Sequence, residues 1–387
     1  MVRRKRIGLI FTVDPNWMGG TYYILNLINA LNTLPDSQKP ELILLCSSED
    51  DYRYAKDYTK YPFLSYRLTF KPKKIDIPKL INKVSRRLIG KSIIPASSFS
   101  EKVDAVYPVI DSMQINTPTA KIYWIPDFQE IHYPDFFTKS ELNRRRQKNM
   151  RIAQQGQNII FSSNDALKDF QQNYDCKRNI NTAVVHFASS IPSYHHSSTK
   201  AILQKFNIDR PFFFCANQIW QHKNHLTLFK AVNELKKQGL NPLLVCSGGT
   251  IDYRNKEYSD FLQRYISENN LKKNIILPGF ISREELVCLM SECIAIVQPS
   301  LFEGWNTGVE EAKALNKFMI VSDIPLHREQ IKNNVKFFSP LNYRQLSEVM
   351  RTIMEKAPEI EPYNYENSIR NYGCDFMNYI NNIANNH

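Results

Sequence analysis

The feature that most constrains the fold of this chain is a repeated alternation of short apolar runs with amphipathic stretches of helical length. Residues 7–13 form a largely apolar run, which is typical of a strand buried on both faces of a parallel sheet. A turn is predicted at residues 18–20, and residues 21–34 then carry apolar side chains at helical spacing. The next strand is predicted at Glu41–Cys46, so these elements form one crossover unit of a doubly wound sheet.

The same alternation continues through the rest of the chain. The first sheet is extended by apolar runs at residues 105–109, 122–125, 159–162 and 183–187. The polar stretch at residues 188–199 predicts an interdomain linker. After the linker, strands are predicted at residues 212–216, 243–246, 275–277, 294–298, 318–321 and 335–338, and helices at residues 226–237, 257–269, 284–293, 309–315 and 343–356.

This pattern predicts an α/β fold with two doubly wound, Rossmann-like domains that face each other across a cleft. A chain of 387 residues exceeds the usual size of a single domain. We predict an N-terminal domain at residues 1–190, a C-terminal domain at residues 200–360, and a C-terminal helical segment at residues 361–387 that could return to the first domain. Ligands of such sheets bind beyond the carboxyl ends of the strands, so we expect a site there.

The net charge of +12 points to an anionic partner, which could be nucleic acid, a membrane surface or a small molecule. Basic residues gather at residues 71–94 and 139–151, and residues 77–89 alternate apolar and basic side chains as in an amphipathic helix. We therefore predict that the chain docks on an anionic membrane surface.

The chain is expected to be cytoplasmic, with a peripheral position at the inner face of the plasma membrane as a further expectation. No stretch approaches the roughly 18 consecutive apolar residues of a membrane-spanning helix. The apolar run after the basic N-terminus is short and lacks a small-residue cleavage site, so we interpret it as a strand instead of a secretory signal.

The seven cysteines indicate neither a disulfide framework nor a zinc site. They are odd in number, scattered, and contain no C-x-x-C pair. No carboxylate cluster resembles a magnesium site. We therefore expect no metal and no cofactor.

The most informative segment is residues 298–329, where Glu303 and Glu311 stand eight positions apart. Thr307 and Glu310 have capping-box spacing, so Thr307 is the predicted N-cap of the following helix. Gly308 keeps this turn small enough for a ligand to approach the backbone. Free backbone N–H groups at a helix N-terminus favour a diphosphate.

This segment resembles the donor-site motif of glycosyltransferase family 4 (group 1), a retaining GT-B family. In that family a P-S-x-x-E-G segment is followed by a second glutamate eight positions after the first. The S-D-I-P-x-x-x-E sequence at residues 322–329 also matches. The resemblance implies a GT-B fold of the bacterial polysaccharide type, in which Glu311 hydrogen-bonds the ribose of the donor and Glu303 the transferred sugar.

The resemblance extends to a second segment, where the family has G-R, a short gap, and then K-G or K-N. Lys223 and Asn224 match this pattern, whereas Asn217 and Gln218 replace the glycine and the arginine. That replacement removes one positive charge, and His222 is a candidate to supply part of it. The donor-binding residues implied by the resemblance are Gly19, Gly20, Gln218, His222, Lys223, Asn224, Gly248, Phe280, Asn306, Thr307, Gly308 and Glu311.

On the acceptor side, residues 124–137 fall where many members carry a His-Asp motif. Asp127 is kept, but Pro126 stands at the histidine position. His132 is a second candidate, although a histidine beside Tyr133 is as often structural. The predicted catalytic residues are therefore Asp127, His132 and Glu303.

The function that the resemblance implies is retaining transfer of a hexose from GDP-mannose or a UDP-sugar to a saccharide or lipid-linked saccharide acceptor. The product would belong to a cell-surface polysaccharide, an O-antigen or a capsule. No covalent nucleophile is needed on this scheme, because a departing phosphate oxygen can take the proton of the acceptor. Catalysis then depends on positioning and on stabilising the charge of the leaving group.

Two other interpretations remain open at this point, and a third is disfavoured. Gln218 and Pro126 would suit a degenerate homologue that binds sugar nucleotides without transfer. A phosphorylase or hydrolase could use Asp127 and Glu303 as a carboxylate pair. A nucleic-acid-binding protein would explain the charge, but no recognition module is readable and the glutamate pair has no role in it, so we expect no nucleic-acid partner.

Overall fold

The structure is a computed structural model of the chain. It describes residues 3–14, 18–69, 85, 97–99, 101–109, 113–115, 119–156, 158–176, 180–191, 199–250, 252, 254–255 and 257–384. These residues form two compact units. The first unit comprises Met1–Pro126, Gln147–Ser189 and Glu366–His387, and the second comprises Asp127–Arg146 and Ser190–Tyr365.

The first unit is built on a seven-stranded parallel sheet in the order β3-β2-β1-β5-β7-β8-β9. Its strands are β1 (Arg6–Ile10), β2 (Glu41–Cys46), β3 (Leu64–Leu68), β5 (Ala105–Tyr107), β7 (Ala120–Ile125), β8 (Asn158–Phe161) and β9 (Asn181–Val184). A separate parallel pair is formed by β4 (Ser97–Phe99) and β6 (Met113–Ile115). The helices that follow the strands include α2 (Glu49–Thr59), α5 (Lys139–Gln155), which crosses into this unit from the second, and α6 (Asn164–Asn173).

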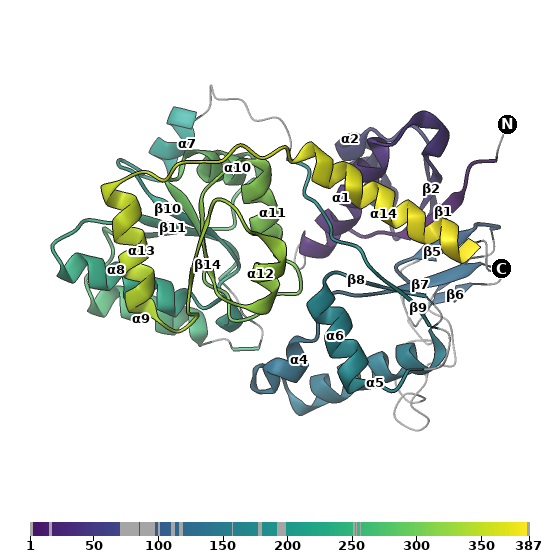
Figure 1. The fold of residues 1–387 in the computed structure, drawn as a ribbon, viewed down its shortest axis with the longest axis horizontal. Coiled ribbons are helices and arrows are strands. Elements are labelled where there is room, and N and C mark those ends of the chain that lie inside the picture. Colours follow the sequence, from purple (N-terminus) through teal and green to yellow (C-terminus); the bar gives the residue numbers. More distant parts are fainter. Residues whose placement is uncertain are drawn as a thin grey trace. The chain divides into compact units, whose positions relative to one another are not determined.

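The C-terminal helix α14 (Glu366–Ala384) packs along α1 (Met18–Asn32), as Figure 1 shows. Gly373 lies at this contact, where an added Cβ would come within 2.5 Å of the carbonyl oxygen of Ala30. The absence of a side chain at that position lets the two helices approach closely.

The second unit is built on a six-stranded parallel sheet in the order β12-β11-β10-β13-β14-β15. Its strands are β10 (Phe213–Ala216), β11 (Leu244–Ser247), β12 (Ile275–Gly279), β13 (Ala295–Gln298), β14 (Met319–Ser322) and β15 (Val335–Phe338). The predicted α/β fold is thus confirmed, with one large parallel sheet in each unit.

The helices of the second unit cover both faces of its sheet. One apolar core joins the sheet to α8 (His225–Lys237), α9 (Tyr258–Glu268) and α13 (Tyr343–Glu355). A second core joins the opposite face to α7 (Thr199–Lys205), α10 (Arg283–Glu292) and α11 (Thr307–Ala314). Successive strand residues such as Phe213 and Phe214 alternate between these cores, which is why the strands are apolar throughout.

Two local predictions are wrong. Residues 18–20 are the first turn of α1 instead of a turn before it, because the burial of Tyr23, Ile24 and Leu27 outweighs the helix cost of two glycines, about 1 kcal/mol each. The N-cap of α11 is Asn306 and not Thr307. Asn306 has an extended backbone, and its side chain accepts a hydrogen bond from the N–H of Val309 at 3.2 Å.

The two units differ from the predicted domain limits in one stretch. Residues 127–146, which contain α4 (Gln129–His132), the 3-10 turn Pro134–Phe136 and the start of α5, group with the second unit. The C-terminal helix α14 groups with the first unit.

The predicted basic helix at residues 77–89 and the charge cluster at 71–94 lie outside the described residues except for Ser85, as do residues 192–198 of the predicted linker. Among the residues that the structure describes, no helix is long and apolar enough to cross a membrane.

Candidate active site

The predicted donor residues of the second unit gather at one edge of its sheet. All six strands are parallel, so the loops after β10, β11, β12 and β13 meet at their carboxyl ends. The loop after β10 carries His222 and Lys223, and the loop after β13 carries Glu303 and Asn306. A backbone hydrogen bond of 2.8 Å from Leu301 to His222 joins these two loops.

Lys223 and Glu303 form an ion pair at the centre of this edge. The Nζ atom of Lys223 donates to both carboxylate oxygens of Glu303 at 2.7 Å. Both side chains are largely withdrawn from solvent, with exposed fractions of 17% and 7%. Two residues that are 80 positions apart in the sequence thus place one cation and one carboxylate at the same point.

Further donors fix the orientation of the Glu303 carboxylate. Its Oε1 atom also accepts hydrogen bonds from Ser300 Oγ at 2.6 Å and from Asn306 Nδ2 at 3.1 Å. Asn306 therefore both caps α11 and holds Glu303. This carboxylate is pre-positioned next to the free N–H groups at the start of α11, where an anionic ligand is favoured.

Gly308 belongs to the same turn. A Cβ at this position would lie 2.5 Å from the side-chain nitrogen of Gln298. The residue has no positive φ, so it is glycine because of crowding beneath the first turn of α11 and not because of its backbone conformation.

The second glutamate of the motif, Glu311, is buried and forms an ion pair with Arg283 at the start of α10. Its neighbour Glu310 points into a different network, in which it accepts from Gln330 at 2.9 Å and from the Tyr365 hydroxyl at 2.6 Å. Only Glu311 therefore lies near the loop after β12, and Glu310 supports the fold.

His222 does not supply the positive charge lost at Gln218. Burial, together with the nearby cations Lys223 and Arg254, holds the pKa of His222 well below its ordinary value of 6.5, so the ring is neutral at neutral pH. The cation present here is Arg254, whose Nη2 atom lies 3.1 Å from Nδ1 of His222. Sequence reasoning missed Arg254 because it lies on a different loop, after β11.

His327 is a second buried histidine behind the site. Its Nδ1 donates to the carbonyl oxygen of Ser322 at 2.8 Å, and its Nε2 faces the amide of Asn306 at 3.3 Å. Burial lowers the pKa of His327 below 6.5, so this ring is also neutral and helps to hold the N-cap of α11.

These two histidines predict a loss of stability in mild acid. Their folded-state pKa values are depressed, so below pH 6.5 the unfolded chain binds protons that the folded chain does not. The contribution of the two neutral histidines to the free energy of unfolding is therefore fully present above pH 6.5. It is lost as the pH falls toward the pKa values that these histidines have in the folded state. At pH 5.5 both histidines are expected to lower the free energy of unfolding, and His222 should contribute more because its pKa is depressed further.

Urea unfolding at pH 7.5, 6.5 and 5.5 measures this effect. The His327→Gln variant should show a smaller loss between pH 7.5 and 5.5 than the wild type. An identical pH dependence in the two proteins would contradict the assignment of a neutral His327.

The remaining predicted donor residues of this unit have different environments. Asn224 has a left-handed backbone, and its amide donates to the carbonyl oxygens of Pro299 at 3.0 Å and Pro340 at 2.7 Å, so its side chain is used by the fold. Phe280 is 71% exposed at the end of β12. Gln218 is half-buried at the start of the loop after β10. Thr307 is half-buried in the first turn of α11.

The candidate acceptor residues lie in the stretch that groups with this unit. Asp127 is half-buried and accepts from the N–H of Gln129 at 3.0 Å, whereas His132 is exposed. The ring of His132 lies 5.3 Å from that of Phe302, and the Tyr133 hydroxyl donates to the carbonyl oxygen of Leu301 at 3.2 Å. This stretch thus packs beside Glu303. Gly19 and Gly20 lie in α1 of the first unit, and their donor role stays a prediction.

The model of the family described as glycosyl transferases group 1 matches residues 198–373 of this chain. That range contains Lys223, Glu303 and Glu311. The match to this family thus covers slightly less than half of the chain. The predicted family resemblance is therefore confirmed for the part of the chain that holds the glutamate pair.

A curated relative of this chain is the O-antigen chain mannosyltransferase RfbU of Salmonella typhimurium (strain LT2). The two are 28% identical over 166 residues, which is 43% of this chain and 44% of RfbU. The match thus spans less than half of the length of the relative.

Solved structures confirm the GT-B fold. HepE of Anabaena, crystallised with UDP and glucose, aligns with a TM-score of 0.65 and 14% identity over 99% of each chain. WaaG, a glycosyltransferase involved in lipopolysaccharide biosynthesis, aligns with a TM-score of 0.59 and 12% identity over 98% of each chain. At these identities the likeness concerns the fold alone.

Three buried side chains of the group 1 domain could approach a metal ion. The ligand atoms of Cys215, His225 and Cys246 lie within 4.8 Å of one another. The two cysteines are partners on β10 and β11, and the hydrogen bond from Cys246 together with the nearby His225 ring lowers the pKa of Cys215. Tetrahedral zinc needs a fourth ligand, so we assign no metal to this cluster. Sequence reasoning missed it because the three positions lack ligand spacing.

Arg283 is another site residue of the group 1 domain that the sequence did not reveal. It follows the N-cap Ser282, and a basic residue in the first turn of a helix is normally disfavoured by the helix dipole. This unfavourable position of a basic residue is the feature of the sequence from which a special role of Arg283 could have been predicted. The ion pair with Glu311 explains why an arginine stands there.

Proposed function

We propose that this chain is a retaining glycosyltransferase of family 4 that transfers a hexose from a nucleoside diphosphate sugar to a saccharide or lipid-linked saccharide. The observation that carries this proposal is the Lys223–Glu303 ion pair beside the N-terminus of α11. A cation and free backbone N–H groups suit the diphosphate of a donor, and the adjacent carboxylate can accept hydrogen bonds from hydroxyls of the sugar.

The other contacts fit the remaining parts of such a donor. Glu311 can accept hydrogen bonds from the ribose hydroxyls, with Arg283 holding its carboxylate in place. Phe280 exposes an aromatic ring at the same edge of the sheet, where a nucleobase could stack on it.

The mechanism we propose needs no covalent nucleophile. Lys223 and the first turn of α11 would stabilise the negative charge that develops on the leaving diphosphate. Glu303 would orient the sugar, and a phosphate oxygen of the leaving group would take the proton of the attacking hydroxyl. Asp127 would act on the acceptor side, with His132 as a second candidate.

Two observations bear on the identity of the donor. The match to an O-antigen chain mannosyltransferase favours GDP-mannose and a role in O-antigen or capsule synthesis. The structural likeness to HepE, which was crystallised with UDP and glucose, keeps a UDP-sugar as the second candidate. Both donors share the diphosphate and the ribose that the site residues would bind.

A thermal-shift panel tests the proposal directly. UDP, GDP, ADP and CMP are each added to the purified protein, and a ligand that binds the folded state raises the melting temperature. We expect one nucleoside diphosphate to raise it, and its sugar conjugate to be consumed when a saccharide acceptor is added. No shift with any nucleotide would favour a degenerate homologue, which the replacement of arginine by Gln218 makes a specific alternative.

We further propose that transfer is independent of metal ions. Lys223 and the N-terminus of α11 would supply positive charge that other enzymes obtain from Mg²⁺. We expect the transfer rate to be unchanged by EDTA, measured as nucleoside diphosphate released per minute. A loss of activity that added Mg²⁺ or Mn²⁺ restores would refute metal independence.

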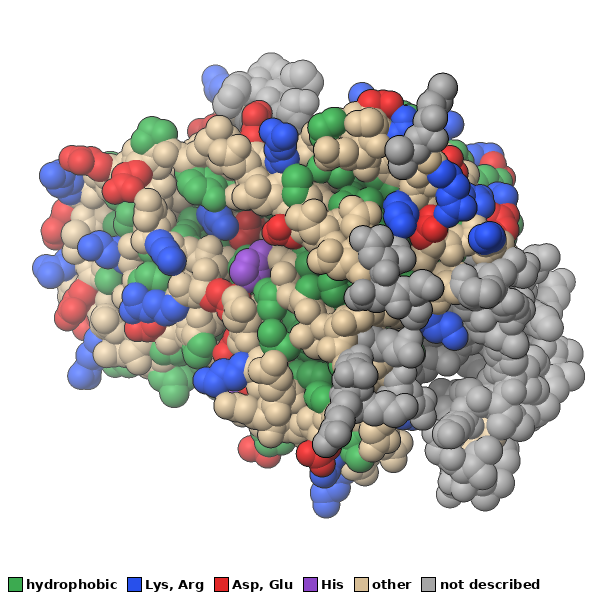
Figure 2. Space-filling view, turned by 45° about the vertical axis from the view of Figure 1, so that its right-hand side comes forward, with side chains coloured by type: hydrophobic (Ala, Val, Ile, Leu, Met, Phe, Trp, Pro, Cys, Tyr) green, Lys and Arg blue, Asp and Glu red, His purple; other side chains and the backbone are tan. Residues whose placement is uncertain are grey.

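A peripheral membrane position is also proposed. In α5, Arg144 and Arg146 are exposed, and exposed cations are attracted to anionic lipid. Basic and acidic side chains are interspersed over the described part of the face in Figure 2. A strongly basic surface on this face is therefore limited to a small area. In sedimentation with vesicles, we expect more binding to phosphatidylglycerol-containing than to pure phosphatidylcholine membranes, and less binding as salt rises. Equal binding to both would reject membrane docking.

A further inference from the structure

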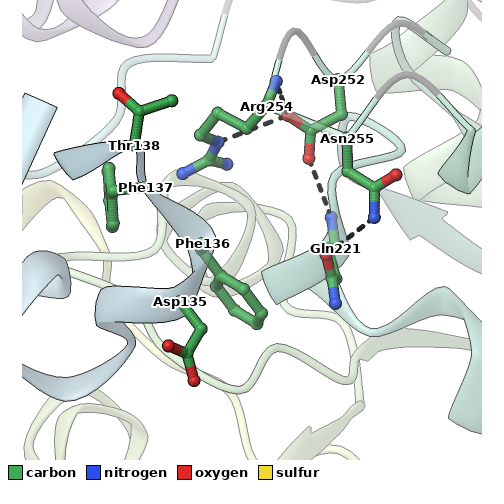
Figure 3. A pocket seen from close by; sticks show the side chains of 8 residues that line it. All are labelled: Asp135, Phe136, Phe137, Thr138, Gln221, Asp252, Arg254 and Asn255. Carbon is green, nitrogen blue, oxygen red and sulfur yellow. Dashed lines mark hydrogen bonds and ion pairs between the residues drawn. The ribbon is translucent and has the colours of Figure 1, made fainter. Parts of the chain in front are cut away.

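A cavity of about 270 Å³ lies within the second unit, beside the donor residues but separate from them. Its walls are residues 135–138 on one side and the side chains of Gln221, Asp252, Arg254 and Asn255 on the other. Figure 3 shows these two walls, with the ring of Phe136 directed between them. The volume lies just below the roughly 300–1,000 Å³ of pockets for drug-sized ligands, so it suits a ligand of one ring.

The chemistry of the lining suits an uncharged polyhydroxylated ligand. Phe136 offers an aromatic surface, and Gln221 and Asn255 offer amides that can both donate and accept hydrogen bonds. Asp135 and Asp252 carry two negative charges against the single positive charge of Arg254. This net negative lining disfavours a phosphate or a uronic acid, which need cationic partners.

The polar groups of the cavity are already held in place. Asp252 is buried and accepts from the backbone N–H of Gln221 at 3.1 Å and from Arg254 Nε at 3.3 Å. Asn255 donates to the side-chain oxygen of Gln221 at 3.0 Å. Pre-organised groups of this kind lose little conformational entropy when a ligand binds.

Arg254 connects the two walls. Its guanidinium lies 5.3 Å from the centre of the Phe137 ring and 4.9 Å from that of Trp220, and it donates to Gln129 Oε1 at 3.1 Å. Only 6% of the side chain is exposed. The arginine thus fixes residues 129–137 against the loops after β10 and β11.

The position of the cavity relative to the donor residues indicates its role. Its loops lead into α8 and α9, which pack on one face of the sheet, whereas Arg283 and Glu311 belong to helices on the opposite face. Lys223 follows His222, whose ring contacts Arg254. The cavity therefore lies next to the Lys223–Glu303 pair, on the side of that pair away from Glu311, the residue predicted to bind the ribose.

We propose that this cavity is a subsite for one neutral hexose unit of the saccharide acceptor. Phe136 contacts the C–H face of the sugar, and the side chains of Gln221, Asp252 and Asn255 bind its hydroxyls. The inference rests on the proposed transferase function and adds to it that part of the acceptor is bound by the donor-side unit.

Saturation-transfer NMR on the full-length protein tests this subsite. The probes are the methyl α-glycosides of mannose, glucose, galactose and N-acetylglucosamine. We expect at least one glycoside to give a signal that persists when saturating UDP or GDP is present. The signal should fall at least about tenfold in Phe136→Ala and in Asn255→Ala, because each removes one wall of the cavity. In Phe261→Ala, which removes an exposed ring on α9 outside the cavity, it should be retained.

Three results would overturn the subsite: no glycoside signal with the wild type, displacement of the glycoside by UDP or GDP, or equal signals in wild type and both cavity variants. Melting temperatures confirm that each variant is folded, and the two cavity variants come from opposite walls, so one unfolded variant does not end the test. Failure of the subsite is distinguishable from failure of the proposed function. A nucleotide that raises the melting temperature without any glycoside binding removes only the subsite.

Discussion

Glu303→Gln is expected to lower the rate of sugar transfer by about 10²–10³-fold, with the protein still folded. Glutamine keeps the shape of the side chain and one oxygen for the hydrogen bonds from Ser300 and Asn306. It removes the charge opposite Lys223, so the ammonium is no longer held at its position beside α11. The weaker hydrogen bonding to the sugar adds to this loss, since a charged acceptor binds more strongly than a neutral one.

The measurement is the initial rate of nucleoside diphosphate release with a saturating donor, together with the melting temperature of each protein. Glu355→Gln is the matched control, because this substitution makes the same chemical change outside the site. Glu355 is exposed at the end of α13. Wild-type turnover in Glu303→Gln would refute the site assignment. A similar loss in both variants would indicate a general effect of charge.

Gly248→Ala is expected to destabilise the protein by about 4 kcal/mol, which is large for a single methyl group. Gly248 has a φ of 146°, a conformation that side-chain-bearing residues rarely adopt. A Cβ there would lie 2.2 Å from the carbonyl oxygen of Asn217 and 2.8 Å from the nitrogen of Gln218. Both are backbone atoms, so the loop after β10 would have to move, and with it the residues around Lys223.

Gly249→Ala is the control, because a Cβ at that position has no neighbour within 4 Å. Urea unfolding of the two variants should give a free energy of unfolding near the wild-type value for Gly249→Ala and a far lower one for Gly248→Ala. Similar values for both variants would show that the loop tolerates displacement, and that Gly248 is not required for the close approach of the two loops.

The ion pairs at the sheet edge show where positive charge lies near Gln218, at which the family resemblance leads us to expect an arginine. Lys223 and Arg254 place two cations on either side of the neutral ring of His222. Arg254 is charge-paired with Asp252, so its main role in the structure is to hold the loops together. Lys223 is paired with Glu303, and its binding of a donor diphosphate stays a prediction.

The sequence by itself determined the fold and pointed to the glutamate pair of the candidate site. Strands such as β13 are buried on both faces because helices cover both faces of the sheet. Consecutive residues of such a strand are therefore apolar, and this continuous run can be recognised in the sequence. The spacing of Glu303 and Glu311 is set by one loop and one helix, so a local pattern reveals it. The N-cap was placed one residue late because Asn306 and Thr307 are both good caps and only the backbone conformation distinguishes them.

Only the tertiary structure decided which distant residues complete the site. Arg254 meets His222 because β10 and β11 are neighbouring parallel strands whose following loops lie side by side. Arg283 meets Glu311 because α10 and α11 pack on the same face of the sheet, although β12 and β13 are not adjacent. The local sequence does not specify this order of strands and helices. The cysteine–histidine cluster across β10, β11 and α8 arises in the same way. Residues 127–146 group with the second unit because contacts such as Arg254–Gln129 and Tyr133–Leu301 join positions more than 100 residues apart. Local periodicity carries no information about contacts at that separation.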